Sequence, residues 1–350
     1  MSLHVIILAA GQGTRMKSSL PKVLHPLAGK PLLAHVIATA RQLSPDMLHI
    51  VYGHGGEKVQ TMLAAPDIEW VYQEEQHGTG HAVQLAVQHI NDDDDVCVMY
   101  GDVPLLSSDT VEDLLGVTGE LGVLTASLVE PGGYGRIIRD ETGSVVAIVE
   151  ERDTSDQQKL IREINTGIMA GKAGIIRTLL SQISRDNDQG ELYLTDIVEL
   201  AVKAGKVVND FCTSNEQEII GINDKIQLAM VERQVQLEVA QELMRAGVTL
   251  ADPGRLDVRG QLKCGKDVMI DVNCVIEGDV TLDDGVTIGP NVYLKDCIVG
   301  ANTNIRANTV IEGAQIGHDA TIGPFARIRP ETRLEDQVHI GNFVEIKKSS

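Results

Sequence analysis

Short apolar runs alternate with amphipathic segments through the first part of the chain, from Leu3 to about Asn223. The apolar runs predict strands at 5–8, 49–52, 69–72, 96–100 and 123–128. The segments between the early runs have helical spacing, as in 31–43, where Leu33, Val36 and Ala40 share one face. Alternation of strands with helices is typical of βαβ units and a mostly parallel sheet covered on both sides. We therefore expect an α/β, Rossmann-like domain over residues 1–223.

One long helical pattern follows at 223–247. Its apolar positions include Ile226, Met230, Leu237 and Leu243. Asn223 is a suitable N-cap and Gly247 a suitable C-terminal stop. We predict a helix here, with residues 224–247 linking two domains.

Beyond this helix, aliphatic residues recur every six positions. One series consists of Leu256, Leu262, Val268, Cys274, Val280, Val286 and Val292, and a second of Ile270, Ile276, Leu282, Ile288 and Leu294. The register shifts by one residue near Val299, Ile305 and Ile311, and then resumes through Ile316, Ile322, Ile328, Leu334, Ile340 and Ile346. A coil with three short flat faces has this period, whereas a β-sandwich predicts alternation by two with irregular turns. We therefore predict a left-handed parallel β-helix over residues 248–350, whose flat faces favour a homotrimer.

This repeat runs to the end of the sequence. Ile346 is followed only by Lys347, Lys348 and two serines, with no polar cap of the kind that a solenoid needs. We expect a truncated chain or part of a longer natural one.

The amino-acid composition argues against several classes of function. A formal net charge of −20 argues against sequence-independent binding of nucleic acid, which needs a basic face. The five cysteines are odd in number and form no C-x-x-C pair, which disfavours a disulfide framework or zinc ribbon and favours a reducing, cytoplasmic location. No signal-peptide pattern and no apolar stretch near the ~18 residues of a membrane span is present, so we expect no membrane partner.

A glycine loop, G-Q-G-T-R at 11–15, directly follows the first apolar run. A dinucleotide fingerprint requires glycine where Met16 stands, and a Walker loop requires a different spacing. Arg15, Lys17 and Lys22 place three cations within eight residues. Backbone N–H groups and such cations suit a polyphosphate. A structural turn with a solvated basic loop is the alternative.

Asp102 follows the apolar run at 96–100. An aspartate just past the carboxyl end of a parallel strand lies where α/β proteins bind ligands, and it could hold Mg²⁺. A turn-forming role for Asp102 stays open. The acidic run at 91–95 is expected to be a solvated loop rather than a metal site.

The segment Q-E-E-Q-H-G-T-G-H at 73–81 offers a third candidate. His77 and His81 have the spacing of a helical zinc pair, but the glycines between them make a poor helix. Glutamine amides beside a Gly-Thr-Gly turn suit recognition of a base edge instead, because an amide both donates and accepts hydrogen bonds.

Taken together, these motifs resemble the bacterial bifunctional UDP-N-acetylglucosamine pyrophosphorylase / glucosamine-1-phosphate N-acetyltransferase family. The resemblance covers the whole chain and rests on L-A-A-G-Q-G-T-R-M with P-K, Q-H-G-T-G-H-A, G-D-V-P-L, G-Y-G-R-I, I-V-E, E-I-N-T-G-I, G-E-L-Y-L-T-D and G-I-N-D, followed by the hexapeptide coil. It implies transfer of UMP from UTP to N-acetylglucosamine-1-phosphate, which releases pyrophosphate and forms UDP-N-acetylglucosamine with Mg²⁺ as cofactor.

The resemblance also implies roles for individual residues. Arg15, Lys22 and Asp102 would be catalytic, with Arg15 and Lys22 on the phosphates, and Asp102 and Asn223 would hold Mg²⁺. The implied substrate contacts are Leu8, Ala10, Gly11, Gly13 and Tyr100 along the nucleotide, Gln73, Gln76, Gly78 and Thr79 at uracil and ribose, and Gly135, Glu150 and Asn165 at N-acetylglucosamine.

The family's second activity, acetyl transfer from acetyl-CoA to glucosamine-1-phosphate, is expected to be absent from this chain. Arg329 and Lys347 match only the beginning of that sugar-phosphate site. The general base and the acetyl-CoA contacts would lie beyond residue 350, in a full-length parent. Two rivals remain: another sugar-nucleotide pyrophosphorylase, of the adenylyl type, and a catalytically silent scaffold subunit.

Overall fold

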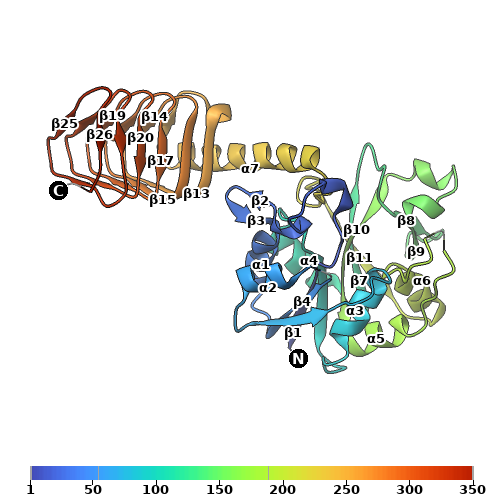
Figure 1. The fold of residues 1–350 in the computed structure, drawn as a ribbon. Helices are drawn as coiled ribbons and strands as arrows, with labels where there is room; N and C mark the ends of the chain where they lie inside the picture. The colour runs from blue at the N-terminus through green and yellow to red at the C-terminus, as the bar shows by residue number, and fades with distance from the viewer. Residues whose placement is uncertain (1, 54, 188, 349–350) are drawn as a thin grey trace. The chain divides into compact units, whose positions relative to one another are not determined.

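The computed structural model describes residues 2–53, 55–187 and 189–348, which divide into two compact units. The first comprises the chain up to His25 together with Pro31–Asp224, and the second comprises Pro26–Lys30 and the chain from Lys225 onward. Many elements of each unit are labelled in Figure 1.

A nine-stranded sheet forms the centre of the first unit. Its strands are β1 (Leu3–Leu8), β4 (Met47–Tyr52), β5 (Ile68–Tyr72), β6 (Asp95–Tyr100), β7 (Leu121–Ser127), β8 (Arg136–Arg139), β9 (Val145–Val149), β10 (Glu163–Lys172) and β11 (Val208–Thr213). The main path runs β11-β7-β10-β6-β1-β4-β5. All neighbours on it are parallel except β10, which runs antiparallel to both β6 and β7. The five predicted strands are confirmed, with ends shifted by one or two residues.

Helices cover both faces of this sheet, which explains why the strands are apolar without alternation. Along β1, Val5 and Ile7 enter one core, while Ile6 and Leu8 enter the other. The first core is closed by α1 (Leu32–Gln42), α2 (Glu57–Leu63) and α4 (Ser108–Val117). The second is closed by α3 (Thr79–Val87), α5 (Ala173–Leu180) and α6 (Asp196–Lys203). The mostly parallel, Rossmann-like α/β architecture expected from the sequence is therefore confirmed.

The run at 91–95 is a solvated loop only in part, because residues 91–93 are exposed whereas Asp94 is buried and Asp95 begins β6. The Asp94 carboxylate is buried and accepts hydrogen bonds from the Ser2 N–H and the Asn91 amide, each at 2.9 Å. Asp92 forms an ion pair with Arg177. These carboxylates hold the start of β6 through long-range contacts that the local sequence does not show.

The second unit begins with α7 (Lys225–Arg245). Gly247 ends this helix as predicted: its φ is +100°, its N–H donates to Met244 O, and the Val248 N–H donates to Leu243 O. This pair of bonds is the Schellman arrangement, in which glycine carries the left-handed residue. The helix starts at Lys225, two residues after the predicted N-cap Asn223.

The rest of the second unit is a coil of short parallel strands (Figure 1). They are β12 (Thr249–Leu250), β13 (Leu256–Cys264), β14 (Met269–Ile270), β15 (Cys274–Leu282), β16 (Thr287–Ile288), β17 (Tyr293–Lys295), β18 (Ile298–Val299), β19 (Asn304–Ile305), β20 (Val310–Glu312), β21 (Gln315–Ile316), β22 (Thr321–Ile322), β23 (Arg327–Ile328), β24 (Arg333–Leu334), β25 (His339–Ile340) and β26 (Glu345–Ile346). A short ribbon of β2 (Pro26–Leu27) and β3 (Lys30–Pro31) joins α7 through the Ala28 N–H, which donates to Glu232 Oε2 at 2.7 Å.

The predicted period of six is the spacing of the coil's core. Leu256 lies beside Cys274 in the next turn, and Val275 beside Tyr293. The aliphatic residues of both series point inward, and most of them are fully buried. The one-residue shift near Val299 is also real, since Thr281 pairs with Ile298 rather than with the following residue. No helix in the described part of either unit combines the length and apolar character needed to cross a membrane.

Candidate active site

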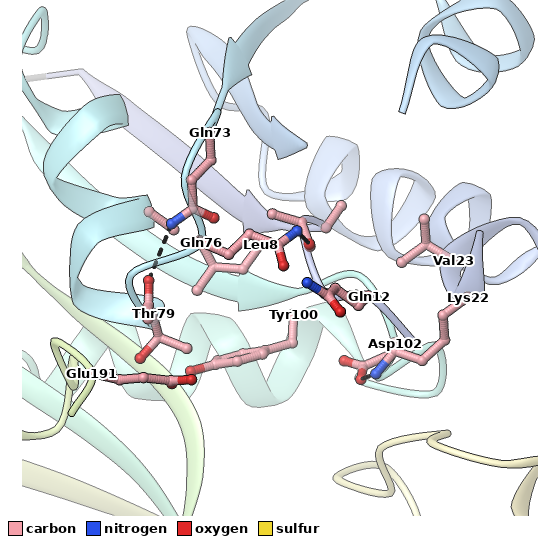
Figure 2. A pocket seen from close by; sticks show the side chains of 15 residues that line it. Leu8, Gln12, Lys22, Val23, Gln73, Gln76, Thr79, Tyr100, Asp102 and Glu191 are labelled. Atoms are coloured by element: carbon pink, nitrogen blue, oxygen red, sulfur yellow. Dashed lines mark hydrogen bonds and ion pairs between the residues drawn. The ribbon is translucent and has the colours of Figure 1, made fainter. Parts of the chain in front are cut away.

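A cavity of about 510 Å³ opens at the carboxyl ends of β1, β5 and β6 (Figure 2). Ligands of open α/β sheets bind at this edge, where the chain leaves neighbouring strands in opposite directions. The lining residues are Leu8, Ala9, Ala10, Gly11, Gln12, Lys22, Val23, Gln73, Gln76, Gly78, Thr79, Ala82, Tyr100, Asp102 and Glu191. Ten of the predicted substrate or catalytic residues are among them: Leu8, Ala10, Gly11, Lys22, Gln73, Gln76, Gly78, Thr79, Tyr100 and Asp102, the last of which is also a predicted metal ligand.

The glycine loop turns back on itself beside the cavity. Gly13 has a φ of +59°, and the short helix Thr14–Met16 follows it. A Cβ at Gly13 would lie 2.7 Å from Lys22 Cβ, so only glycine lets the loop pack against Lys22. Gly11 has open space on its side-chain face. The loop thus combines close packing on Lys22 with an accessible backbone at the cavity.

Lys22 lies between two oxygen-bearing side chains. Its ammonium forms an ion pair with Asp102 and donates to Asn223 Oδ1 at 3.2 Å. The Ile222 N–H donates to the Asp102 carbonyl at 2.9 Å, and this bond holds the 219–223 segment beside the loop after β6. The Asn223 side chain therefore faces the site. Figure 2 shows Lys22 and Asp102 pointing toward each other at one end of the cavity.

These residues fit a Mg²⁺ site. The Asp102 carboxylate and the Asn223 amide oxygen converge on the same cationic group, the Lys22 ammonium. Carboxylate and amide oxygens are the hard ligands that Mg²⁺ accepts, with phosphate and water oxygens supplying the rest. Two oxygen donors already directed at one cation are chemically suited to hold another.

Two glutamines line the opposite end of the cavity (Figure 2). The Gln73 amide nitrogen donates to Gly78 O at 3.2 Å and lies 3.2 Å from His81 Nδ1. The Gln76 amide nitrogen donates to the carbonyl of Ala10. Hydrogen bonds to backbone carbonyl groups therefore orient the side-chain amides of both glutamines.

The His77/His81 pair does not form a helical zinc site. The helix α3 starts at Thr79, so His77 lies outside it, and His77 pairs with the Glu75 carboxylate at 2.6 Å. No cluster of three or more His, Cys, Asp or Glu side chains suited to a metal occurs among residues 2–53, 55–187 and 189–348.

The predicted sugar-binding residues form a second cluster beside the cavity. The Asn165 N–H donates to Gly135 O at 2.9 Å, and Glu150 Oε1 accepts from the Thr195 hydroxyl at 2.9 Å. Burial raises the pKa of Glu150, an effect that the Thr195 hydrogen bond opposes.

Tyr100 connects this cluster to the cavity. Its ring packs on Gly167, where an added Cβ would lie 2.6 Å from a ring carbon, and Gly167 directly follows the Asn165 segment. Burial first, and then the charges of Glu150 and Asp102, raise the pKa of the Tyr100 hydroxyl. Tyr100 is therefore uncharged, and it lies between the cavity and the second cluster, near the carboxylates of Asp102 and Glu150.

Besides Gly13, Asn223 and the predicted sugar-binding residues Gly135, Glu150 and Asn165, three further predicted residues are not among those that line this cavity. Arg15 is exposed on the short helix after Gly13. Arg329 and Lys347 lie in the second unit, on adjoining turns of the coil, where the Arg329 N–H donates to Ile346 O at 2.9 Å and its guanidinium lies 3.5 Å from Glu345.

Sequence reasoning missed several lining residues. Gln12 and Val23 flank residues that were identified, and their neighbours could have pointed to them. Glu191 comes from a distant loop: the Leu192 N–H donates to His77 O at 2.7 Å, and the Gly80 N–H donates to Leu192 O at 2.8 Å. The G-E-L-Y-L-T-D motif that contains Glu191 contributes to the family resemblance, but no local sequence pattern predicts that it lies against the Gly-Thr-Gly turn.

Comparison with known proteins agrees with this geometry. The family described as MobA-like NTP transferase domain matches residues 5–164, and the GMPPB C-terminal domain family matches residues 258–350. A solved structure from Bacillus anthracis, named for a glucose-1-phosphate thymidylyltransferase, superposes with a TM-score of 0.53 at 21% identity. The superposition covers 66% of this chain and 94% of the Bacillus anthracis chain. This likeness supports the fold alone.

Curated relatives are much closer in sequence. The chain is 51% identical over 349 residues to the Bifunctional protein GlmU of Ralstonia pickettii (strain 12J), and 54% identical over 348 residues to that of Dechloromonas aromatica (strain RCB). Each alignment covers 99% of this chain and 77% of the relative. Because these alignments span nearly the whole chain at more than 50% identity, the chain belongs to the family of bifunctional GlmU proteins.

Proposed function

We propose that this chain transfers UMP from UTP to N-acetylglucosamine-1-phosphate and forms UDP-N-acetylglucosamine and pyrophosphate. The observation that carries the proposal is the convergence of Lys22, Asp102 and Asn223 at one end of an amide-lined cavity. Membership of the GlmU family supports the same reaction.

The reaction needs no nucleophile from the protein. A phosphate oxygen of the sugar phosphate attacks the α-phosphorus of UTP, the new P–O bond forms, and the bond to the β-phosphate oxygen breaks to release pyrophosphate. Two anions must be aligned and their charge neutralised, and positioning with electrostatic stabilisation is the main requirement of phosphoryl and nucleotidyl transfer.

The residues at the cavity divide this work. The backbone at Gly11 and Gly13 and the ammonium of Lys22 would bind the phosphates, with Arg15 reaching them from the exposed turn. Asp102 and Asn223 would hold Mg²⁺, which when bound supplies further positive charge against the phosphate oxygens. In its absence, Asp102 holds Lys22 in place.

The two ends of the substrate would occupy separate places. Gln73, Gln76, Gly78 and Thr79 would bind uracil and ribose, with Leu8 and Ala10 beside them. Gly135, Glu150 and Asn165 would bind N-acetylglucosamine on the other side of Tyr100. The hydrogen-bonded pairing of Asn165 with Gly135 supports this second subsite.

For the second unit, we propose a left-handed parallel β-helix that assembles as a homotrimer. Stacked parallel strands with buried aliphatic columns support the β-helix. Arg329 and Lys347 would be the beginning of the acetyltransferase sugar-phosphate site. We propose that acetyl transfer to glucosamine-1-phosphate needs residues of the full-length relatives beyond these 350. We also propose a cytoplasmic location, which the free thiols of all five cysteines support.

Pyrophosphate release from UTP and N-acetylglucosamine-1-phosphate, with and without Mg²⁺, tests this function. We expect turnover only with both substrates and Mg²⁺, and no acetyl transfer from acetyl-CoA. A folded protein that releases no pyrophosphate would contradict the enzyme, and equal turnover with ATP would favour the adenylyl-type rival. Detectable acetyl transfer would refute the proposed limit on the second activity.

A further inference from the structure

The orientation of the Gln73 amide is set by two partners outside the cavity. Gln73 is only 3% exposed, yet it lines the cavity. Its amide nitrogen faces Gly78 O and His81 Nδ1, each at 3.2 Å. Figure 2 shows this nitrogen turned toward the loop and the amide oxygen turned toward the cavity. With both N–H directions engaged by the protein, the amide presents an acceptor to whatever binds there.

His81 is suited to act as the acceptor. It lies in the first turn of α3, and Nδ1 is the ring nitrogen that lies 3.2 Å from the Gln73 amide nitrogen. A neutral imidazole has one N–H and one lone pair, and the tautomer protonated at Nε2 leaves the lone pair of Nδ1 to accept from the Gln73 amide. Burial, followed by the neighbouring His77, lowers the pKa of His81, which favours this neutral form.

Rotation of the amide by 180° would be unfavourable. The amide oxygen would then face the Gly78 carbonyl oxygen and the lone pair of His81, and the amide hydrogens would lose both acceptors. Gln76 is held in the same sense, since its amide nitrogen donates to Ala10 O.

An acceptor at this position distinguishes two pyrimidines. Uracil carries an N–H at N3, which can donate to the Gln73 oxygen. Cytosine carries a lone pair at N3, which would face that oxygen without a hydrogen bond. A buried polar site that matches one partner disfavours the one that leaves its groups unpaired.

We propose that His81 is a positioning residue that fixes the Gln73 amide in the orientation that selects uracil over cytosine. This inference rests on the proposed function, because it assumes that the base of UTP lies against Gln73. His81 does not itself touch the nucleotide in this role.

The test compares two substitutions of His81. His81→Leu removes the acceptor, whereas His81→Asn retains one at the position of Nδ1. We measure kcat/KM for UTP and for CTP with N-acetylglucosamine-1-phosphate, and we check folding by circular dichroism. The UTP-to-CTP ratio should fall about tenfold in the leucine variant, as expected for one lost hydrogen bond, and stay within about threefold of wild type in the asparagine variant.

Several outcomes would overturn the inference. They are an unchanged ratio in a folded leucine variant, a parallel loss with both nucleotides, or an asparagine variant as unselective as the leucine variant. If the leucine variant does not fold, ¹⁵N NMR of the wild-type histidine rings decides the question. A protonated Nδ1 on His81 contradicts the inference, and an unprotonated Nδ1 supports it. Absence of UTP turnover in the wild type would instead contradict the proposed function.

Discussion

Lys22 forms an ion pair with Asp102, although the two residues lie in segments that follow different strands of the sheet, β1 and β6. Both side chains are mostly buried, and the Lys22 ammonium also reaches Asn223 at 3.2 Å. Because β1 and β6 are adjacent and parallel, the loops after them meet at one edge. The cation and the carboxylate are therefore in place before any substrate binds.

Replacement of either partner should remove most of the activity. Lys22→Ala and Asp102→Ala are each expected to lower kcat/KM at least a hundredfold, roughly the effect of losing one preorganised charge at a transition state. Pyrophosphate release measures the loss. Lys58→Ala, an exposed lysine on α2, is the matched control and should retain activity. A Lys22 variant with normal turnover would contradict the assigned role.

Substitutions of Asn223 and Asp224 should distinguish a role in catalysis from a role in stability. Asn223→Ala is expected to lower activity at least tenfold while the free energy of unfolding changes by less than about 1 kcal/mol, because α7 begins two residues later. Asp224→Ala, at the position before the helix, should cost about 1 kcal/mol and retain activity. Thermal unfolding by circular dichroism and pyrophosphate release measure the two effects. The opposite pattern would restore the N-cap role to Asn223.

Substitutions of the two loop glycines, Gly11 and Gly13, should affect the enzyme in different ways. Gly13→Ala places a methyl group 2.7 Å from Lys22 Cβ at a φ of +59°, so it should lower both stability and kcat. Gly11→Ala meets no protein atom within 4 Å and should leave the melting temperature unchanged while it raises KM for UTP. Melting curves and steady-state kinetics distinguish these outcomes. A Gly13→Ala enzyme with wild-type stability would show that the loop is free to move away from Lys22.

Glu218 should be a major contributor to stability. It is 2% exposed, and its carboxylate accepts hydrogen bonds from the Ser107 N–H at 3.2 Å and from the hydroxyls of Thr110 and Thr213 at 2.8 and 2.5 Å. Glu218→Ala leaves these donors without their acceptor and should cost about 3 kcal/mol. Urea unfolding, followed through the single tryptophan, Trp70, reports on this unit. The exposed Glu216→Ala is the control and should change the free energy of unfolding by less than about 0.5 kcal/mol.

Stability should fall at mildly acidic pH because of His49. Burial lowers the pKa of this 3% exposed histidine, and the nearby His4 and His89 lower it further, while Glu69 opposes the shift. The unfolded state, with a histidine pKa of about 6.5, then takes up a proton before the folded state does. The stabilisation is therefore complete above about pH 6.5 and is lost as the pH falls through the lower folded pKa.

A substitution isolates this contribution. His49→Gln removes the titrating group, so its free energy of unfolding should decline less between pH 7.5 and pH 5.5 than that of the wild type. Urea unfolding at both pH values provides the comparison. Equal declines in the two proteins would assign the acid sensitivity to other groups.

Local patterns predicted much of this molecule because repeated burial leaves a repeated signature. The strands of the first unit are apolar without alternation since both faces of the sheet are covered, and the coil has a period of six since each short face buries an aliphatic residue. The turn chemistry was less visible. Many left-handed residues of the coil are asparagine or aspartate, such as Asn273, Asn291 and Asn308, rather than glycine.

The sequence by itself determined the two architectures, the position of the glycine loop and the candidate groups on either side of it. Only the tertiary structure decided how those groups meet: that Asn223 faces Lys22, that Glu191 reaches the cavity, and that His81 lies beside the Gln73 amide. The physical reason is the range of the interactions. Periodicity and turn residues report contacts made within a few positions, whereas the site is assembled by strand order from residues that lie far apart along the chain.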